Sequence, residues 1–109
     1  MTDKIIVLST CATEADAERL ARVLVAGRLA ACVNVLPGVR SFYHWKGEIE
    51  SSQEFLLLVK TSRDLFPALR TEIEKLHTYE LPELVALPVV EGSDNYLAWL
   101  QSNLRGVSE

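Results

Sequence analysis

The sequence contains few cysteines and no cluster of basic residues. Its two cysteines, Cys11 and Cys32, are too few to hold a disulfide-rich scaffold together, so we expect reduced thiols that pack as small apolar side chains. The 11 lysines and arginines are scattered along the chain, and 15 acidic residues give a net charge of −4. Because binding to nucleic-acid phosphates requires clustered basic side chains, the sequence predicts no nucleic-acid partner.

Long apolar runs are absent as well. No segment approaches the roughly 20 apolar residues that cross a bilayer, so the sequence predicts no membrane association. Residues Met1 to Lys4 lead directly into a short apolar run, and they show neither the basic start nor the long apolar stretch of a signal peptide. We therefore expect a cytoplasmic protein.

The amino-acid composition is that of an ordinary globular domain. Of the 109 residues, 49% are hydrophobic and 24% are charged, and the chain shows no internal repeat, low-complexity segment or linker. A chain of this length is near the common size of one compact unit. We therefore expect a single domain that spans residues 1–109.

Hydrophobic periodicity predicts alternating strands and helices. Short apolar runs predict strands at residues 4–10, 30–36 continuing through 39–45, 49–60 and 84–90. Helical spacing predicts helices that begin at Thr13, near residues 61–64 and at Ser93. The order βαββαβ, with right-handed crossovers, folds most simply as a four-stranded antiparallel sheet with two helices on one face. The predicted fold class is α+β: a ferredoxin-like sandwich with an extended β-hairpin and a C-terminal helix.

The central hairpin is long for a chain of this size. Residues 31–45 span roughly 50 Å when extended, whereas a compact domain of this length is only about 35 Å across. The part beyond the predicted Pro37-Gly38 bend carries large apolar side chains: Val39, Phe42, Tyr43, Trp45 and Ile49. Such a ribbon is marginally ordered and prone to aggregate unless a neighbour covers it, which predicts a closed homo-oligomer. The alternative is a hairpin that curls back over its own sheet.

Three segments resemble a known family. They are Ala30–Gly38 with Tyr43–Glu50, then Leu57–Thr61, then His77–Leu84 with Tyr96–Leu100. From end to end the chain is similar to the CutA-type divalent-cation tolerance proteins. The resemblance implies a homotrimer of ferredoxin-like subunits whose long hairpins wrap neighbouring subunits, with a role in copper tolerance and divalent-cation binding. It also implies an architecture like that of the PII signalling trimers, and it brings no enzymatic reaction with it.

The residues themselves favour binding over catalysis. The chain has two histidines, His44 and His77, and it has neither a G-x-S-x-G motif nor a glycine-rich phosphate loop, so we expect no enzyme. The candidate metal ligands are His77, Cys11 and Glu83, whose imidazole, thiol and carboxylate suit copper or another divalent cation. The alternative for His77 is a structural side chain with satisfied hydrogen bonds.

The resemblance adds two positions to this ligand set. In the family, a cysteine in the first strand and a histidine pair before the Tyr-x-x-Pro-Glu segment are implicated in copper binding. Ser9 and Leu76-His77 stand at those positions here, so His77 alone matches directly. Cys11 lies two residues beyond Ser9, which in a strand returns it to the same face.

Three functions are consistent with these sequence features. The first is a trimeric metal-responsive binding protein. The second is a PII-like sensor that binds a small anionic metabolite between subunits, in a cleft lined by Tyr79, Pro82 and Glu83. The third is a trimeric scaffold for partner proteins.

Overall fold

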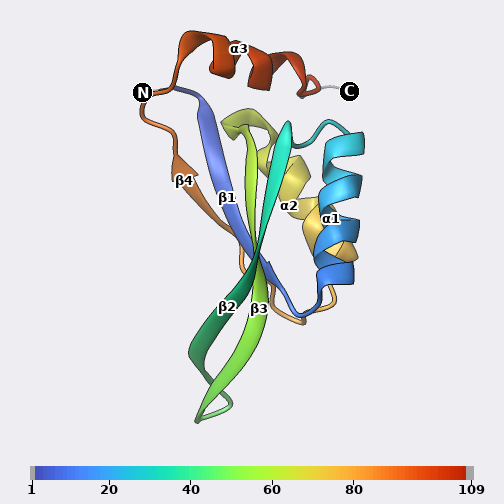
Figure 1. Ribbon diagram of the computed structural model, residues 1–109. Helices are drawn as coiled ribbons and strands as arrows, with labels where there is room; N and C mark the ends of the chain where they lie inside the picture. The colour runs from blue at the N-terminus through green and yellow to red at the C-terminus, as the bar shows by residue number, and fades with distance from the viewer. Residues whose placement is uncertain (1, 108–109) are drawn as a thin grey trace.

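The computed structural model describes residues 2–107, which form one four-stranded sheet and three α-helices (Figure 1). The elements are β1 (Lys4–Cys11), α1 (Glu14–Ala26), β2 (Cys32–Trp45), β3 (Glu48–Ser62), the 3-10 helix η1 (Arg63–Leu65), α2 (Phe66–Leu76), β4 (Val85–Pro88) and α3 (Asp94–Ser102). All strand pairs are antiparallel, and the strand order is β2-β3-β1-β4. The predicted order of strands and helices is confirmed.

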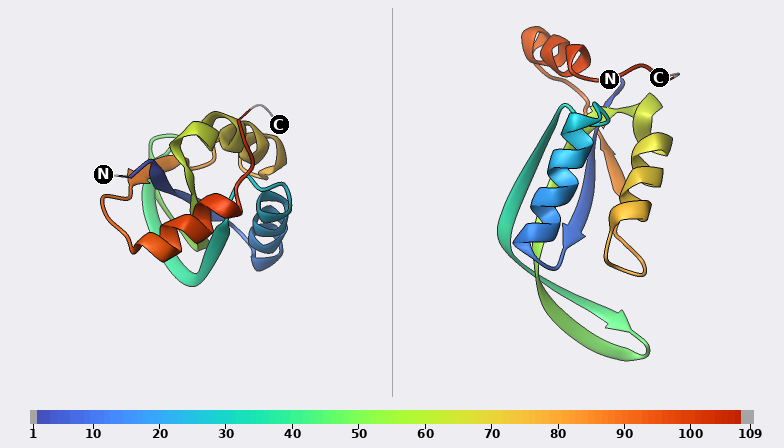
Figure 2. Two further views of the ribbon diagram at one scale, coloured as in Figure 1. Left: turned by 90° about the horizontal axis from the view of Figure 1, so that it is seen from above. Right: turned by 90° about the vertical axis from the view of Figure 1, so that its right-hand side faces the viewer.

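Helices α1 and α2 cover one face of the sheet, and α3 lies across the end where β1 begins (Figure 2). The core forms between the two covering helices and alternate residues of the central strands, and it includes Leu20, Leu24, Val7, Leu57, Val59, Leu69 and Ile73. Helix α3 is held to the sheet by Lys4, whose Nζ donates to Gln101 Oε1 at 2.6 Å. None of the helices in residues 2–107 has both the length and the apolar character needed to cross a membrane.

Local sequence signals place most helix ends correctly. The Thr13 hydroxyl accepts a hydrogen bond from Asp16 N–H, and the Ser93 hydroxyl accepts one from Tyr96 N–H, so both predicted N-caps are confirmed. The second helix starts later than predicted, because residues 63–65 form a 3-10 turn before α2 begins. Strand β4 is shorter than predicted because Pro88 has no N–H to donate to the sheet. Among residues 89–107, one further backbone bond to β1 follows it, from Val89 N–H to Lys4 O.

The hairpin of β2 and β3 runs far beyond the other strands and makes the molecule 44 Å long and 27 Å wide (Figure 1). Its register shifts between Leu36 and Val39, where the sequence predicts a bulge at Pro37-Gly38. The tip is a tight reversal at Lys46-Gly47, as the glycine between two strand segments predicts, and both residues have the positive φ angles of a two-residue hairpin turn. The distal half bends beneath the loop between α2 and β4, so the hairpin does not fold back over the sheet (Figure 2).

The hydroxyl of Ser9 leads to a first prediction. Ser9 Oγ is fully buried on the helix-covered face and has no hydrogen-bond partner among residues 2–107. A buried hydroxyl without a partner costs about 1 kcal/mol or more, so Ser9→Ala should raise the free energy of unfolding by about 1 kcal/mol. Thr61→Val is the matched control, because Thr61 Oγ1 donates to Leu29 O at 2.7 Å and its loss should destabilise. Urea denaturation measures both, and a less stable Ser9→Ala variant would contradict the prediction.

Candidate functional site

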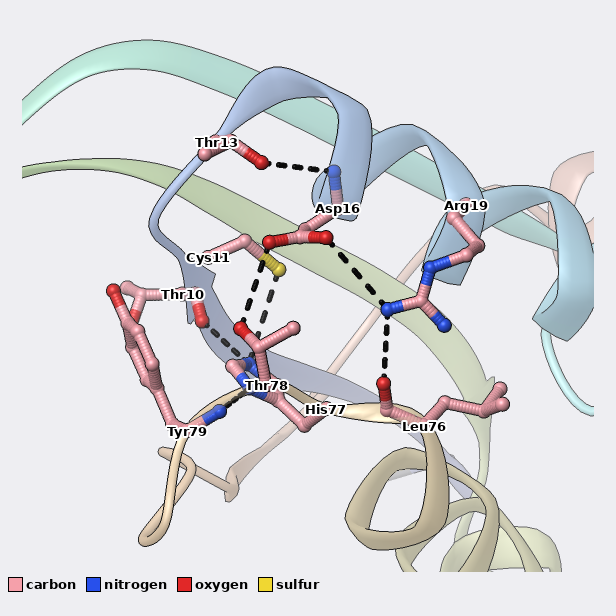
Figure 3. Close-up of polar contacts among 9 residues, drawn as sticks. All are labelled: Thr10, Cys11, Thr13, Asp16, Arg19, Leu76, His77, Thr78 and Tyr79. Carbon is pink, nitrogen blue, oxygen red and sulfur yellow. Dashed lines mark hydrogen bonds and ion pairs between the residues drawn. The ribbon is translucent and has the colours of Figure 1, made fainter.

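His77 lies at the C-terminal end of α2, where its ring is held by two hydrogen bonds (Figure 3). The Tyr79 backbone N–H donates to Nδ1 at 2.9 Å, and Nε2 lies 2.7 Å from the carbonyl oxygen of Thr10. Since Nδ1 accepts, the neutral ring carries its proton on Nε2 and donates it to that carbonyl. Within a single chain His77 is therefore a satisfied structural side chain that fastens the loop after α2 to the end of β1.

Cys11 is the last residue of β1, and its Sγ lies 3.8 Å from His77 Nε2 (Figure 3). The fold thus brings together two predicted ligands that are 66 residues apart in sequence. The thiol is free and fully buried. Burial, together with the nearby Asp16 carboxylate, raises the pKa of the thiol to about 11, while Arg19 opposes the shift. The thiol is therefore protonated at neutral pH, and a bound metal would have to displace that proton.

The carboxylate of Glu83 stands apart from this pair. Glu83 is exposed on the loop after α2, where it lines a cleft to which neither Cys11 nor His77 contributes. Within residues 2–107, no three histidine, cysteine, aspartate or glutamate side chains gather closely enough to hold a metal ion. A soft thiol and an imidazole suit copper or zinc, but two donors leave a metal in need of further ligands.

Glu83 lines a cleft next to the Cys11–His77 pair. The cleft lies between the distal half of the hairpin and the loop at residues 79–83, and its volume is about 780 Å³. We call it the hairpin cleft. Tyr79, Pro82 and Glu83, which the sequence analysis places in a cleft between subunits, all line this cleft of the single chain.

Glu54 is the cleft residue that sequence reasoning missed. The residue is 7% exposed, and its carboxylate accepts a hydrogen bond of 2.6 Å from the Tyr79 hydroxyl. Burial raises the pKa of this carboxyl, but hydrogen bonds from the hydroxyls of Ser41, Tyr79 and Thr10 outweigh it and leave the pKa below its ordinary value. The signal in the sequence was an acidic residue directly before the apolar run at residues 55–59.

Tyr79 joins the two parts of the site. Its backbone N–H holds His77, its ring lies 4.7 Å from the imidazole ring, and its hydroxyl holds Glu54. Burial and the adjacent Glu54 carboxylate raise the pKa of the Tyr79 phenol, so it remains a neutral hydrogen-bond donor. The end of β1, the loop after α2 and the hairpin are therefore connected by one series of side-chain contacts.

Comparisons with known proteins agree on one family. The model of the CutA1 divalent ion tolerance protein matches residues 5–103. The divalent-cation tolerance protein CutA of Thermus thermophilus is 50% identical over 98 residues, which are 90% of this chain and 95% of that protein. The crystal structure of CutA from Xylella fastidiosa is 43% identical and superposes with a TM-score of 0.93 over 95% of this chain and all of that one. The periplasmic divalent cation tolerance protein CutA from Archaeoglobus fulgidus is 34% identical, with a TM-score of 0.91 over 94% and 99% of the two chains.

Proposed function

Because the chain belongs to the CutA1 family of divalent ion tolerance proteins, we propose that it is a homotrimer that responds to divalent cations by binding copper at Cys11 and His77. The 3.8 Å separation of Cys11 Sγ and His77 Nε2 carries this proposal. In it, the ring proton of His77 moves from Nε2 to Nδ1, so that Nε2 offers a lone pair while the bonds to Thr10 O and from Tyr79 N–H are given up, and Cys11 loses its proton. Glu83 is the proposed carboxylate ligand. The protein binds and does not catalyse, and its proposed location is the cytoplasm.

The trimer and its ferredoxin-like subunit belong to the proposal, and uncovered apolar surface supports the assembly. Phe42 and Ile49 on the hairpin are 65% and 73% exposed in the single chain. Val85 and Leu87 of β4 pair with Leu8 and Ile6 of β1, so they lie on the sheet face opposite α1 and α2, and both are half exposed. An apolar surface of this kind is typical of a protein–protein interface.

Copper titration of metal-free protein under anaerobic conditions tests the ligand pair. We expect Cys11→Ser and His77→Ala each to weaken binding at least tenfold, since each removes one of two adjacent donors. The matched controls are Cys32→Ser and His44→Ala, which remove the other thiol and the other imidazole of the chain. Glu83→Gln tests the carboxylate. A wild-type affinity weaker than about 10 µM, unchanged in both ligand variants, would refute direct copper binding.

Ser9→Cys provides a gain-of-function test. Ser9 and Cys11 both lie buried on the helix-covered face of β1, as the strand period predicts. A thiol at residue 9 adds a soft donor on that face, so copper should bind more tightly to the variant than to the wild type. Equal affinities would show that this face of β1 does not take part in metal binding.

A PII-like sensor remains the second candidate, and the hairpin cleft is the observation that favours it. Its volume of about 780 Å³ is within the range of small-molecule sites. Four glutamates line it, however, and their negative charge opposes the binding of the small anionic metabolite expected of such a sensor. A scaffold function would be indicated if neither copper nor small ligands bind.

A further inference from the structure

The hairpin cleft contains a buried carboxylate, Glu54, that forms no ion pair within residues 2–107. Glu54 is more than nine-tenths buried, and its lowered pKa keeps it ionised at neutral pH. Its hydrogen bonds come from neutral hydroxyl groups, and no ion pair to it occurs within residues 2–107. A buried carboxylate is costly unless a cation balances it.

The rest of the cleft lining adds further negative charge. Glu50, Glu80 and Glu83 also line it, and no lysine, arginine or histidine does so in the described part of the chain. The two basic residues nearest along the hairpin, Arg40 and Lys46, lie against the rings of Phe42 and Trp45 at 5.4 and 6.0 Å. Neither forms an ion pair with the four carboxylates.

Aromatic side chains supply the remaining wall. Tyr43 and Trp45 line the cleft on the same face of the hairpin as Glu50, because Tyr43 pairs with Glu50 in the β2–β3 register and Trp45 lies two residues on. Aromatic faces attract cations, and the attraction strengthens as water is excluded. Aromatic rings around a carboxylate favour an organic cation over a metal ion, because a metal needs several ligands and no three acidic side chains within residues 2–107 gather closely enough to supply them.

We propose that the hairpin cleft binds a small organic amine whose ammonium group pairs with Glu54 and whose apolar body packs on Trp45 and Tyr43. The occupant has the opposite charge to the effectors expected of an anion sensor. The site shares neither Cys11 nor His77 with the proposed copper site, although Glu83, the proposed carboxylate ligand, lines the cleft as well.

Three matched ligands test the charge preference on the full-length, metal-free protein in its native assembly. They are 2-phenylethylamine, 2-phenylethanol and phenylacetate, which share a ring and differ in charge. Calorimetric titration should detect the amine, with the alcohol and the carboxylate binding at least tenfold more weakly. Equal binding of amine and carboxylate, or no amine binding at 10 mM, would overturn the proposal. Binding of a lysine-rich peptide without the free amine would also overturn it, in favour of a protein partner.

Matched variants test which cleft residues bind the amine. Glu54→Gln keeps the size of the side chain and removes its charge, and it should weaken amine binding at least tenfold while the alcohol binds as before. Trp45→Leu should weaken both ligands. Glu48→Gln, next to the hairpin tip and outside the cleft lining, should change neither. Cys32→Ser, which changes a thiol of β2 outside the cleft lining, should also leave amine binding intact, and a loss in that variant would place the ligand elsewhere. If Glu54→Gln fails to fold, Glu50→Gln provides the charge test with the same expected direction.

Discussion

Replacing Ile49 by aspartate is expected to break the assembly into single chains or aggregates. Ile49 is next to the hairpin tip, and 73% of it is exposed in one chain. In a lone subunit such a surface change would alter stability by less than about 0.5 kcal/mol. If a neighbouring subunit covers the hairpin, the same change buries an unpaired charge at a cost of several kcal/mol per subunit. Multi-angle light scattering should therefore show the loss of a species three times the 12.2 kDa chain mass.

Val25→Asp is the matched control for this experiment. Val25 is an apolar residue of α1 that is 42% exposed and lies outside both the hairpin and the sheet. The same aspartate at this position should leave the assembly mass unchanged. A native mass in the Ile49→Asp variant, at micromolar protein concentration, would show that the hairpin tip is not an interface. It would then leave the exposed face of β4 as the apolar surface available for assembly.

Features of the hairpin that depend on local chemistry could be read from the sequence. The Pro37-Gly38 bulge and the Lys46-Gly47 turn follow from residue types that favour those backbone angles, and both are confirmed. The bend of the distal half toward the loop after α2 has no such local signal. It depends on contacts such as the Tyr79–Glu54 hydrogen bond, which joins residues 25 positions apart. The part that the hairpin contributes to the cleft, including Glu54, was missed for the same reason, whereas Tyr79, Pro82 and Glu83 were predicted to line a cleft.

In the candidate site too, some features follow from the sequence and others depend on how the elements pack. The period of a strand predicts that Ser9 and Cys11 share a face, and both are buried on the core side. The contact between Cys11 and His77 instead requires the end of β1 to meet the end of α2, which depends on how α2 packs across the sheet. The structure also shows that Tyr79 and Thr10 satisfy both ring nitrogens of His77, and no sequence pattern indicates this.

The buried thiol of Cys11 leads to the second large effect, a loss of stability in mild alkali. The thiol pKa is about 11 in the folded chain against 9.0 for the ordinary group, mainly because burial opposes the thiolate. Between these values the unfolded chain releases the proton more readily and binds fewer protons, so the free energy of unfolding falls as pH rises. The contribution of the protonated Cys11 thiol to the free energy of unfolding is fully present below pH 9 and is lost above pH 11. The total loss is roughly 2 to 3 kcal/mol.

Cys11→Ala isolates this contribution from other groups that titrate in the same range. Urea unfolding of metal-free protein at intervals from pH 8 to 11.5 should show wild-type stability falling toward that of Cys11→Ala, by roughly 2 to 3 kcal/mol relative to it. Cys32→Ala retains the Cys11 thiol and should follow the wild type. A constant difference between wild type and Cys11→Ala across the range would mean that the folded chain accommodates the thiolate at this position. In that case copper would not have to overcome a raised thiol pKa to bind at Cys11 and His77, and its affinity would rise little between pH 9 and 11.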